Sequence, residues 1–224
     1  MKKLEIACFN LASALIAQEH GADRVELCAD IQLGGTTPTL DDVAQAQRQL
    51  DIELFIMIRP RGGDFSYSEE EFQQMKESIA QIKRLNIDGF VFGILNEDNS
   101  INIDQNSELV NLAKPMKCTF HRAFDKVTDY KAALEQVISC GFSTILTSGT
   151  FPNVMEGKVV LKDLVHLADN QITIMPGGGL RSTNILELDQ LVNTTFYHSS
   201  ALTDDSEIAN PDEVAELKRK ISSL

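Results

Sequence analysis

The sequence lacks several features that would assign it to a common class of protein. It has no apolar run approaching the length of a membrane span, and no signal-peptide-like apolar segment follows Met1-Lys2-Lys3. Its four cysteines are scattered singly and form no disulfide framework. Basic residues number 20 against 33 acidic ones, and the net charge of −13 argues against nucleic acid or an anionic membrane surface as partner. These absences favour a cytoplasmic protein with reduced thiols.

Motifs typical of nucleotide-binding enzymes are also missing. The sequence has no Gly-x-Gly-x-x-Gly fingerprint and no phosphate loop ending in Lys-Ser or Lys-Thr. No stretch resembles an interdomain linker or a low-complexity tract. With 43% hydrophobic residues in 224, the chain can bury one sizeable core. We therefore expect residues 1–224 to form a single domain.

Strand-like and helix-like segments alternate eight times along the chain. Eight such units predict an α/β fold, a single-domain (β/α)8 TIM barrel at the short end of its size range. The alternative is an open doubly wound sheet, which usually has fewer units or a distinct second domain. The expected strands cover residues 4–9, 24–28, 54–58, 89–92, 117–121, 143–147, 172–175 and 195–198. The expected helices cover about 10–19, 40–50, 68–85, 107–113, 130–139, 158–168, 183–192 and 212–221.

One strand end has an unusual concentration of charge. Functional residues of such a barrel lie at the C-terminal ends of its strands. At Ile58-Arg59-Pro60-Arg61-Gly62-Gly63-Asp64 an apolar run breaks into two arginines, two glycines and an aspartate. Arg59 and Arg61 are therefore candidates to bind a carboxylate or phosphate, although Arg61 also fits a role in shaping the loop. The alternative is a structural Arg–Asp ion pair that closes the turn.

Three residues near strand ends are candidates for proton transfer. His121 and Asp125 fit an acid–base couple, with Arg122 available to hold an anionic group of a substrate. Glu26, if it faces the barrel interior, needs a cationic partner or a raised pKa, and Arg59 on the next strand is the expected partner. The alternative is an ion network of Glu26, Arg59 and Asp125 that only fills the barrel mouth.

The last strands end in residues suited to an anion. Loops after strands seven and eight of a barrel commonly form a phosphate site from backbone N–H groups and a helix N-terminus. Glycines permit close approach of the backbone to the anion, and hydroxyl groups add donors. Glycine-rich turns also occur simply as tight turns, which is the alternative. The candidate residues are Gly177, Gly178, Gly179, Ser148, His198 and Ser199.

A metal site is a further possibility. Thiolate and thioether ligands suit Cu(I), and the chain has Cys28 at a strand end and Met57 and Met175 within strands. Lone cysteines and buried methionines are more often core residues, which is the alternative. Cys118 has the opposite strand parity to His121, so if His121 faces inward Cys118 should face the helices.

Five motifs spread over the chain resemble those of the CutC family. The resemblance implies a TIM-type barrel, a cytoplasmic location, a homodimer and a role in copper homeostasis. The family pattern has a cysteine two residues after the first-strand glutamate, where this sequence has Ala7. A thiolate pair from the first two strands would then be reduced to Cys28. The motifs are Gly21-Ala22-Asp23-Arg24-Val25-Glu26-Leu27-Cys28, Ile58-Arg59-Pro60-Arg61-Gly62-Gly63-Asp64-Phe65, Phe120-His121-Arg122-Ala123-Phe124-Asp125, Leu146-Thr147-Ser148-Gly149 and His198-Ser199-Ser200.

Three functional hypotheses follow from these residues. The first is a cytosolic copper-binding or copper-handling protein that uses Cys28. The second is a barrel enzyme acting on a small phosphorylated or carboxylated metabolite, with the arginines binding the anion. The third is a non-catalytic scaffold whose helices form a homodimer.

Overall fold

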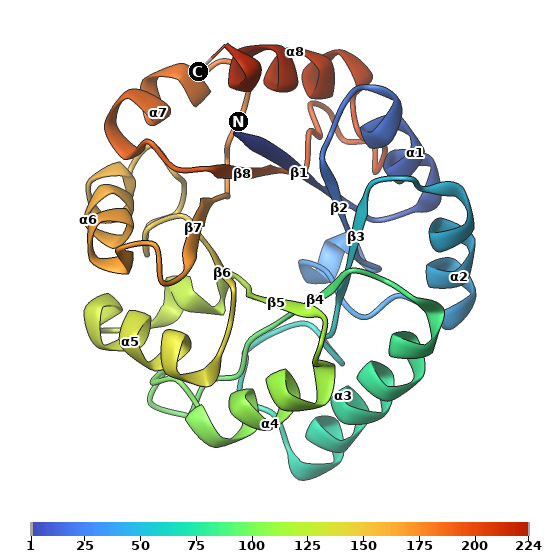
Figure 1. Ribbon diagram of the computed structural model, residues 1–224, viewed down its shortest axis with the longest axis vertical. Coiled ribbons are helices and arrows are strands. Elements are labelled where there is room, and N and C mark those ends of the chain that lie inside the picture. The colour runs from blue at the N-terminus through green and yellow to red at the C-terminus, as the bar shows by residue number, and fades with distance from the viewer. Residues whose placement is uncertain (1, 224) are drawn as a thin grey trace.

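Eight parallel strands alternate with helices in the computed structural model, which describes residues 2–223 (Figure 1). The strands form a central barrel and the helices form an outer ring around it. The predicted (β/α)8 barrel is confirmed. The strands are β1 (Lys3–Cys8), β2 (Arg24–Leu27), β3 (Glu53–Met57), β4 (Gly89–Phe92), β5 (Lys117–Phe120), β6 (Thr144–Thr147), β7 (Thr173–Pro176) and β8 (Phe196–Ser199). The α-helices are α1 (Leu11–Glu19), α2 (Leu40–Gln49), α3 (Glu69–Ile82), α4 (Ile103–Ala113), α5 (Tyr130–Cys140), α6 (Lys158–Ala168), α7 (Ile185–Val192) and α8 (Pro211–Ser222). Short 3₁₀ turns cover Ile31–Leu33, Lys83–Leu85 and Arg122–Lys126.

The strand order excludes the open-sheet alternative. The strands pair in the order β7-β6-β5-β4-β3-β2-β1-β8, so the first strand lies between the second and the last. Every pairing is parallel, for example Glu5 of β1 opposite His198 of β8 and opposite Arg24 of β2. At the seam between β7 and β8, the Thr194 hydroxyl donates a hydrogen bond to the Ile174 carbonyl at 2.5 Å. The barrel is therefore nearly closed.

Local capping signals explain where helices begin. The Asn10 side chain accepts a hydrogen bond from the Ser13 N–H at the start of α1. Ser68 and Glu71 form the capping box expected at the start of α3. The prediction for α4 was wrong at its start, because the helix begins one turn earlier, at Ile103, behind an Asn102 cap.

Strand alternation separates two apolar layers. Leu4, Ile6 and Cys8 of β1 point outward into the main core between strands and helices. Cys118 also lies in that outer core, as its parity predicted. A much smaller cluster fills the barrel interior, namely Cys28, Phe55, Met57 and Val91, with Phe9 packed against it. Cys28 therefore faces the inside of the barrel, near its mouth.

Candidate functional site

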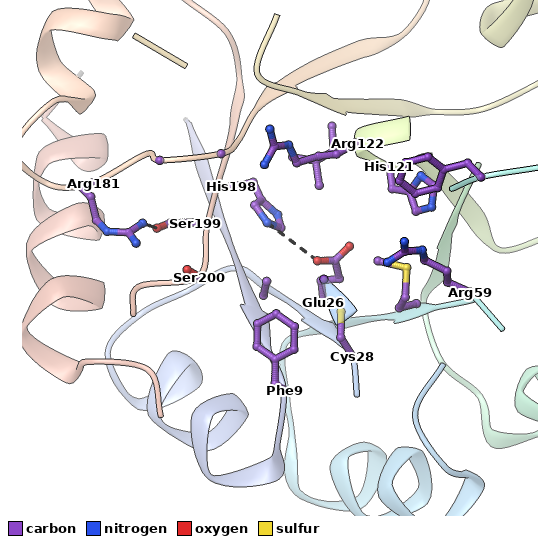
Figure 2. Close-up of a pocket in the computed structure, with 17 residues that line it drawn as sticks. Phe9, Glu26, Cys28, Arg59, His121, Arg122, Arg181, His198, Ser199 and Ser200 are labelled. Atoms are coloured by element: carbon purple, nitrogen blue, oxygen red, sulfur yellow. Dashed lines mark hydrogen bonds and ion pairs between the residues drawn. The ribbon is translucent and has the colours of Figure 1, made fainter. Parts of the chain in front are cut away.

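A cavity of about 260 Å³ opens at the C-terminal ends of the strands (Figure 2). Residues at the ends of β2, β3, β5 and β8, and in the loops that follow these strands, contribute to its lining. The predicted site residues that line it are Glu26, Cys28, Arg59, His121, Arg122, Gly178, Gly179, His198 and Ser199. Four other predicted residues, Arg61, Asp125, Ser148 and Gly177, are not among the lining residues.

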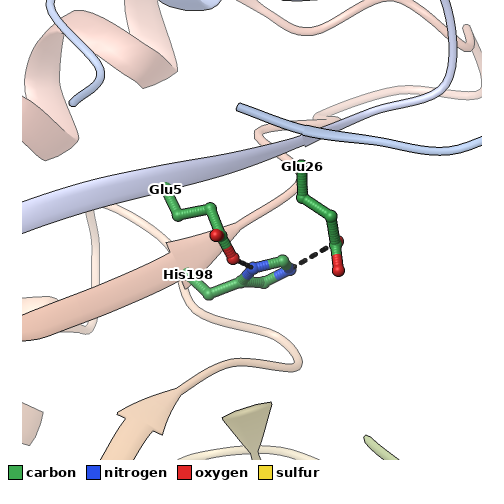
Figure 3. A group of neighbouring side chains, drawn as sticks. All are labelled: Glu5, Glu26 and His198. Carbon is green, nitrogen blue, oxygen red and sulfur yellow. Dashed lines mark hydrogen bonds and ion pairs between the residues drawn. The ribbon is translucent and has the colours of Figure 1, made fainter. Parts of the chain in front are cut away.

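Two of the lining residues, Glu26 and His198, belong to a row of buried charged groups, and Figure 3 shows them together with Glu5. Arg24 donates a hydrogen bond to one carboxylate oxygen of Glu5. The other oxygen of Glu5 lies 2.6 Å from Nδ1 of His198. Nε2 of the same imidazole lies 3.9 Å from Oε2 of Glu26. His198 therefore bridges two buried carboxyl groups, and it is the nearest cationic partner of Glu26.

The side chains of Glu5, Glu26 and His198 have pKa values shifted in different directions because their surroundings differ. Burial alone would raise the pKa of Glu5, but the charges of Arg24 and His198 outweigh it and lower that pKa below its ordinary value of 4.5. Burial raises the pKa of Glu26 from 4.5 to about 7, against the opposing charge of His198. Burial would lower the pKa of His198, but the hydrogen bond with Glu5 and the two carboxylates raise it. The site therefore favours the carboxylate of Glu5 and the imidazolium of His198, and Glu26 is near its midpoint at neutral pH.

Arg59 does not pair with Glu26 as the sequence suggested. Its guanidinium donates hydrogen bonds to the carbonyl oxygens of Leu33 at 2.8 Å, Gly35 at 3.1 Å and Gly63 at 2.9 Å. It also lies over the ring of Phe65, 4.8 Å from the centroid. Arg59 thus holds the loops after β2 and β3 together and forms one wall of the cavity.

His121 and Asp125 do not form the expected couple among the described residues. Nδ1 of His121 accepts a hydrogen bond from the Ala123 N–H at 3.3 Å. Asp125 instead accepts bonds from the Ser148 N–H at 2.9 Å and from Nε of Arg122 at 2.7 Å. The alternative network of Glu26, Arg59 and Asp125 is not formed either, because each of the three has separate partners. Asp125 organises the loop after β6 rather than facing the cavity.

Two other predicted residues have structural contacts outside the cavity. Arg61 forms ion pairs with Glu71 at 2.6 Å and with Asp64 at 2.9 Å, so the alternative of an Arg–Asp pair applies to it. The Ser148 hydroxyl lies 2.9 Å from Asp125 and receives a hydrogen bond from Arg122 at 3.0 Å. Neither side chain is placed to meet a ligand in this cavity.

The glycine run makes room for side chains. A Cβ on Gly177 would lie 2.4 Å from Leu146 and 2.9 Å from His198. Gly178 has a φ of +101°, and a Cβ there would lie 2.8 Å from the guanidinium carbon of Arg122. The run is therefore needed for Arg122 and His198 to occupy their positions, and Gly178 and Gly179 contribute backbone to the cavity wall.

Three functional side chains were missed by sequence reasoning. The side chains of Glu5 and Arg24 point into the barrel from β1 and β2. The sequence signal for them was a charged residue at a strand position whose side chain faces the barrel interior. Arg181 lines the cavity next to Ser199, to whose hydroxyl it donates at 3.3 Å (Figure 2). Its position, two residues after Gly179, was the signal for that residue.

Comparison with known proteins places the chain in a family. The model of the CutC family matches residues 2–203. A human protein named copper homeostasis protein cutC homolog is 40% identical over 198 residues, covering 88% of this chain and 72% of the relative. A Photorhabdus laumondii family protein CutC is 44% identical over 201 residues, covering 90% and 80%.

Solved structures of known proteins support the same family assignment. A Streptococcus agalactiae protein described as copper homeostasis protein CutC superimposes with a TM-score of 0.85 at 32% identity, covering 89% of this chain and 99% of that one. Phosphoribosylanthranilate isomerase from Thermotoga maritima, at 14% identity and a TM-score of 0.67, shares the fold alone. With a family model matching nearly its whole length and relatives at about 40% identity, this chain belongs to the CutC family.

Proposed function

We propose that this protein acts in copper homeostasis, with Cu(I) as a cargo bound at the barrel mouth. Support comes from its human, mouse and Caenorhabditis elegans relatives, each of which is named copper homeostasis protein cutC homolog. The observation that carries the proposal is the presence of two sulfur side chains, Cys28 and Met57, in the lining of one cavity. Sulfur ligands are those that Cu(I) prefers.

The two sulfur-containing residues belong to neighbouring strands and to the same interior cluster. Leu27 of β2 pairs with Ile56 of β3, so Cys28 and Met57 occupy the next position of the two strands. The Cys8 thiol is directed to the Ile6 carbonyl in the outer core. Among the described residues, Cys28 is thus the single cysteine that lines the cavity.

The buried acidic cluster suits this cargo less well. Ligand atoms of Glu5, Glu26 and His198 lie within 4.8 Å of one another. Carboxylates favour harder cations than Cu(I). Both ring nitrogens of His198 also face carboxyl groups, and the raised pKa of that imidazole favours the protonated form, which does not coordinate a metal. The sulfur pair is therefore the proposed binding position.

Competition titration of Cu(I) against a chelator tests the proposal. Cys28→Ser should weaken binding at least tenfold, since the variant loses the thiolate ligand. Cys140→Ser, at the C-terminal end of α5, is the matched control, because Cys140 is also buried but does not line the cavity; it should bind as the unaltered protein does. Equal Cu(I) affinity in the unaltered protein and in Cys28→Ser would rule out specific handling at this site.

The cavity also supports a second candidate function, binding of a small anionic metabolite by a barrel enzyme. Three arginines, Arg59, Arg122 and Arg181, line the cavity together with His198, whose pKa is raised by its carboxyl partners, and Glu26 is the one carboxyl group among the lining residues. This gathering of positive charge lies in a chain whose net charge is −13. A phosphate or carboxylate would complement that charge. Glu26, whose pKa is raised to about 7, is then the residue proposed to move a proton.

A thermal-shift series tests this second candidate. Inorganic phosphate and dihydroxyacetone phosphate at millimolar concentration should raise the melting temperature. Arg122→Ala should reduce the rise, since the Arg122 side chain lines the cavity and is 42% exposed, although its Nε is paired with Asp125. Arg219→Ala, on the surface of α8, is the matched control. Absence of stabilisation by any anion would contradict the candidate.

The oligomeric state and location are proposed from the family. We infer a homodimer in the cytoplasm. No helix within residues 2–223 is both long and apolar enough to cross a membrane. Sedimentation velocity at micromolar concentration distinguishes a dimer of the 24.8 kDa chain from a monomer.

A further inference from the structure

The imidazole of His121 is held in one orientation at the cavity wall. Its Nδ1 accepts the Ala123 N–H, so the ring proton lies on Nε2. Phe65 packs on it edge-on at 4.9 Å between ring centroids. A Cβ on Gly93 would lie 2.8 Å from its Nδ1, so the glycine provides the space for the ring. His121 therefore presents a fixed N–H donor.

That donor has no acceptor among the described residues. Nε2 of His121 is buried and unpartnered, although the residue lines the cavity. Burial, aided by the charge of Arg59, lowers the pKa of His121 to about 3, so the ring stays neutral at physiological pH. A buried donor without an acceptor is costly to the fold, so its presence at a binding cavity indicates that a ligand supplies the acceptor.

A second unpartnered atom lies in the same cavity. Oε1 of Glu26 is buried and has no hydrogen-bond partner within residues 2–223. Figure 2 shows Glu26 and His121 bordering the same space, with Arg59 and His198 beside them. A ligand that fills the space would place one acceptor at His121 and one hydrogen-bonding group at Glu26.

The charges of the residues that line the cavity indicate where the anionic group and the uncharged acceptor of a ligand would bind. Arg122 and Arg181 line the cavity with positively charged guanidinium groups, which suit an anionic group, although Arg122 also pairs with Asp125. His121 is neutral and packed against aromatic rings, which suits an uncharged acceptor such as a carbonyl oxygen. The cavity of about 260 Å³ is just below the usual range of roughly 300–1,000 Å³ for ligand pockets, so the compound is small.

We propose that the cavity binds a small anionic compound with a carbonyl group next to a hydroxyl group, and that Nε2 of His121 donates a hydrogen bond to the carbonyl oxygen. This inference rests on the anion-binding candidate above and specifies its ligand class. It also changes the role expected of His121. The imidazole is a neutral donor that orients and polarises a carbonyl, rather than a group that gains and loses a proton.

Two matched pairs of compounds test the proposal by isothermal titration calorimetry. Dihydroxyacetone phosphate and glycerol 3-phosphate differ only in a carbonyl against a hydroxyl group, and hydroxypyruvate and glycerate form the corresponding carboxylate pair. In the unaltered protein the carbonyl member of at least one pair should bind roughly fivefold or more tightly. The pair that binds identifies the anionic group as phosphate or carboxylate.

Variants of His121 assign the preference to its ring. His121→Phe should reduce the carbonyl preference to about one, while glycerol 3-phosphate or glycerate still binds through the arginines. His121→Gln, which keeps an N–H donor, should retain part of the preference. His166→Phe, at an exposed position on α6, is the matched control and should change nothing.

Infrared difference spectroscopy of the unaltered protein provides a readout that does not depend on any variant folding. The carbonyl stretching band of bound dihydroxyacetone phosphate or hydroxypyruvate should move to lower wavenumber than in water. An unmoved band, or equal affinity for both members of each pair in the unaltered protein, would overturn the inference. If these compounds bind without a carbonyl preference, the anion-binding candidate survives and only the inference fails. If no anion binds at all, both fail.

Discussion

Glu26→Gln should make the protein more stable at pH 8 and leave its stability unchanged near pH 4. The carboxyl group of Glu26 is 3% exposed, and burial raises its pKa from 4.5 to about 7. In the unfolded chain this group loses its proton near pH 4.5, but in the folded barrel it keeps the proton until about pH 7. Between these values the unfolded state binds fewer protons, so stability falls as pH rises through this window.

The size of the effect follows from the two pKa values. Each pKa unit corresponds to about 1.4 kcal/mol, so the change from 4.5 to about 7 destabilises the fold by about 3 kcal/mol above pH 7. The buried position leaves little solvent screening to reduce this value. Glutamine has nearly the same shape and no charge, so it removes the penalty while filling the same space.

Urea denaturation between about pH 3.5 and pH 8 measures the difference in free energy of unfolding between the two proteins. Glu5→Gln is the control of opposite sign. The pKa of Glu5 is lowered because Arg24 and His198 outweigh its burial, so the charged form stabilises the fold. Glu5→Gln should therefore be less stable at neutral pH, and its deficit should narrow as pH falls below 4.5.

The reasoning would be refuted if Glu26→Gln were no more stable than the unaltered protein at pH 8. It would also fail if the stability difference did not grow between pH 4.5 and pH 7. Either result would mean that another charge, besides that of His198 at 3.9 Å, offsets the cost of burying the Glu26 carboxylate in the folded state.

Three further predictions concern packing, the loop after β6 and copper. Gly89→Ala places a Cβ 2.5 Å from the ring of Phe55 inside the barrel and should cost about 1–3 kcal/mol in urea denaturation. Asp125→Asn weakens hydrogen bonds from four donors on three loop residues to a charged acceptor and should cost roughly 2 kcal/mol, with faster amide exchange over residues 147–151. Burial, with the charge of Glu26, raises the pKa of the Cys28 thiol, so Cu(I) affinity should increase steadily from pH 6 to pH 9; a flat profile would contradict a thiolate ligand.

Element types followed from local sequence signals. The strand over Gly89–Phe92 and the helix over Lys158–Ala168 have the bounds expected from their apolar patterns. Strand parity correctly turned Cys118 outward. The start of α4 was missed because its signal is a single asparagine side chain, Asn102, that accepts the Gln105 N–H, rather than an apolar repeat.

The residues at the barrel mouth were largely predictable, because all parallel strands end at the same side of a barrel. Their partners were not. Arg59 was expected to meet a carboxylate and instead binds three backbone carbonyls, whose positions depend on the folded loops. Asp125 was expected to meet His121 and instead holds the loop after β6.

The sequence by itself thus determined the barrel, its family and the set of polar strand ends, since these depend on periodicity and on residue types at given positions. The tertiary structure decided which charges touch. Closure of the barrel brings β8 against β1, so that His198 meets Glu5 across a separation of 193 residues and then faces Glu26. Burial raises the pKa of Glu26, while the charges and hydrogen bonds of these contacts, which no local pattern encodes, lower the pKa of Glu5 and raise that of His198.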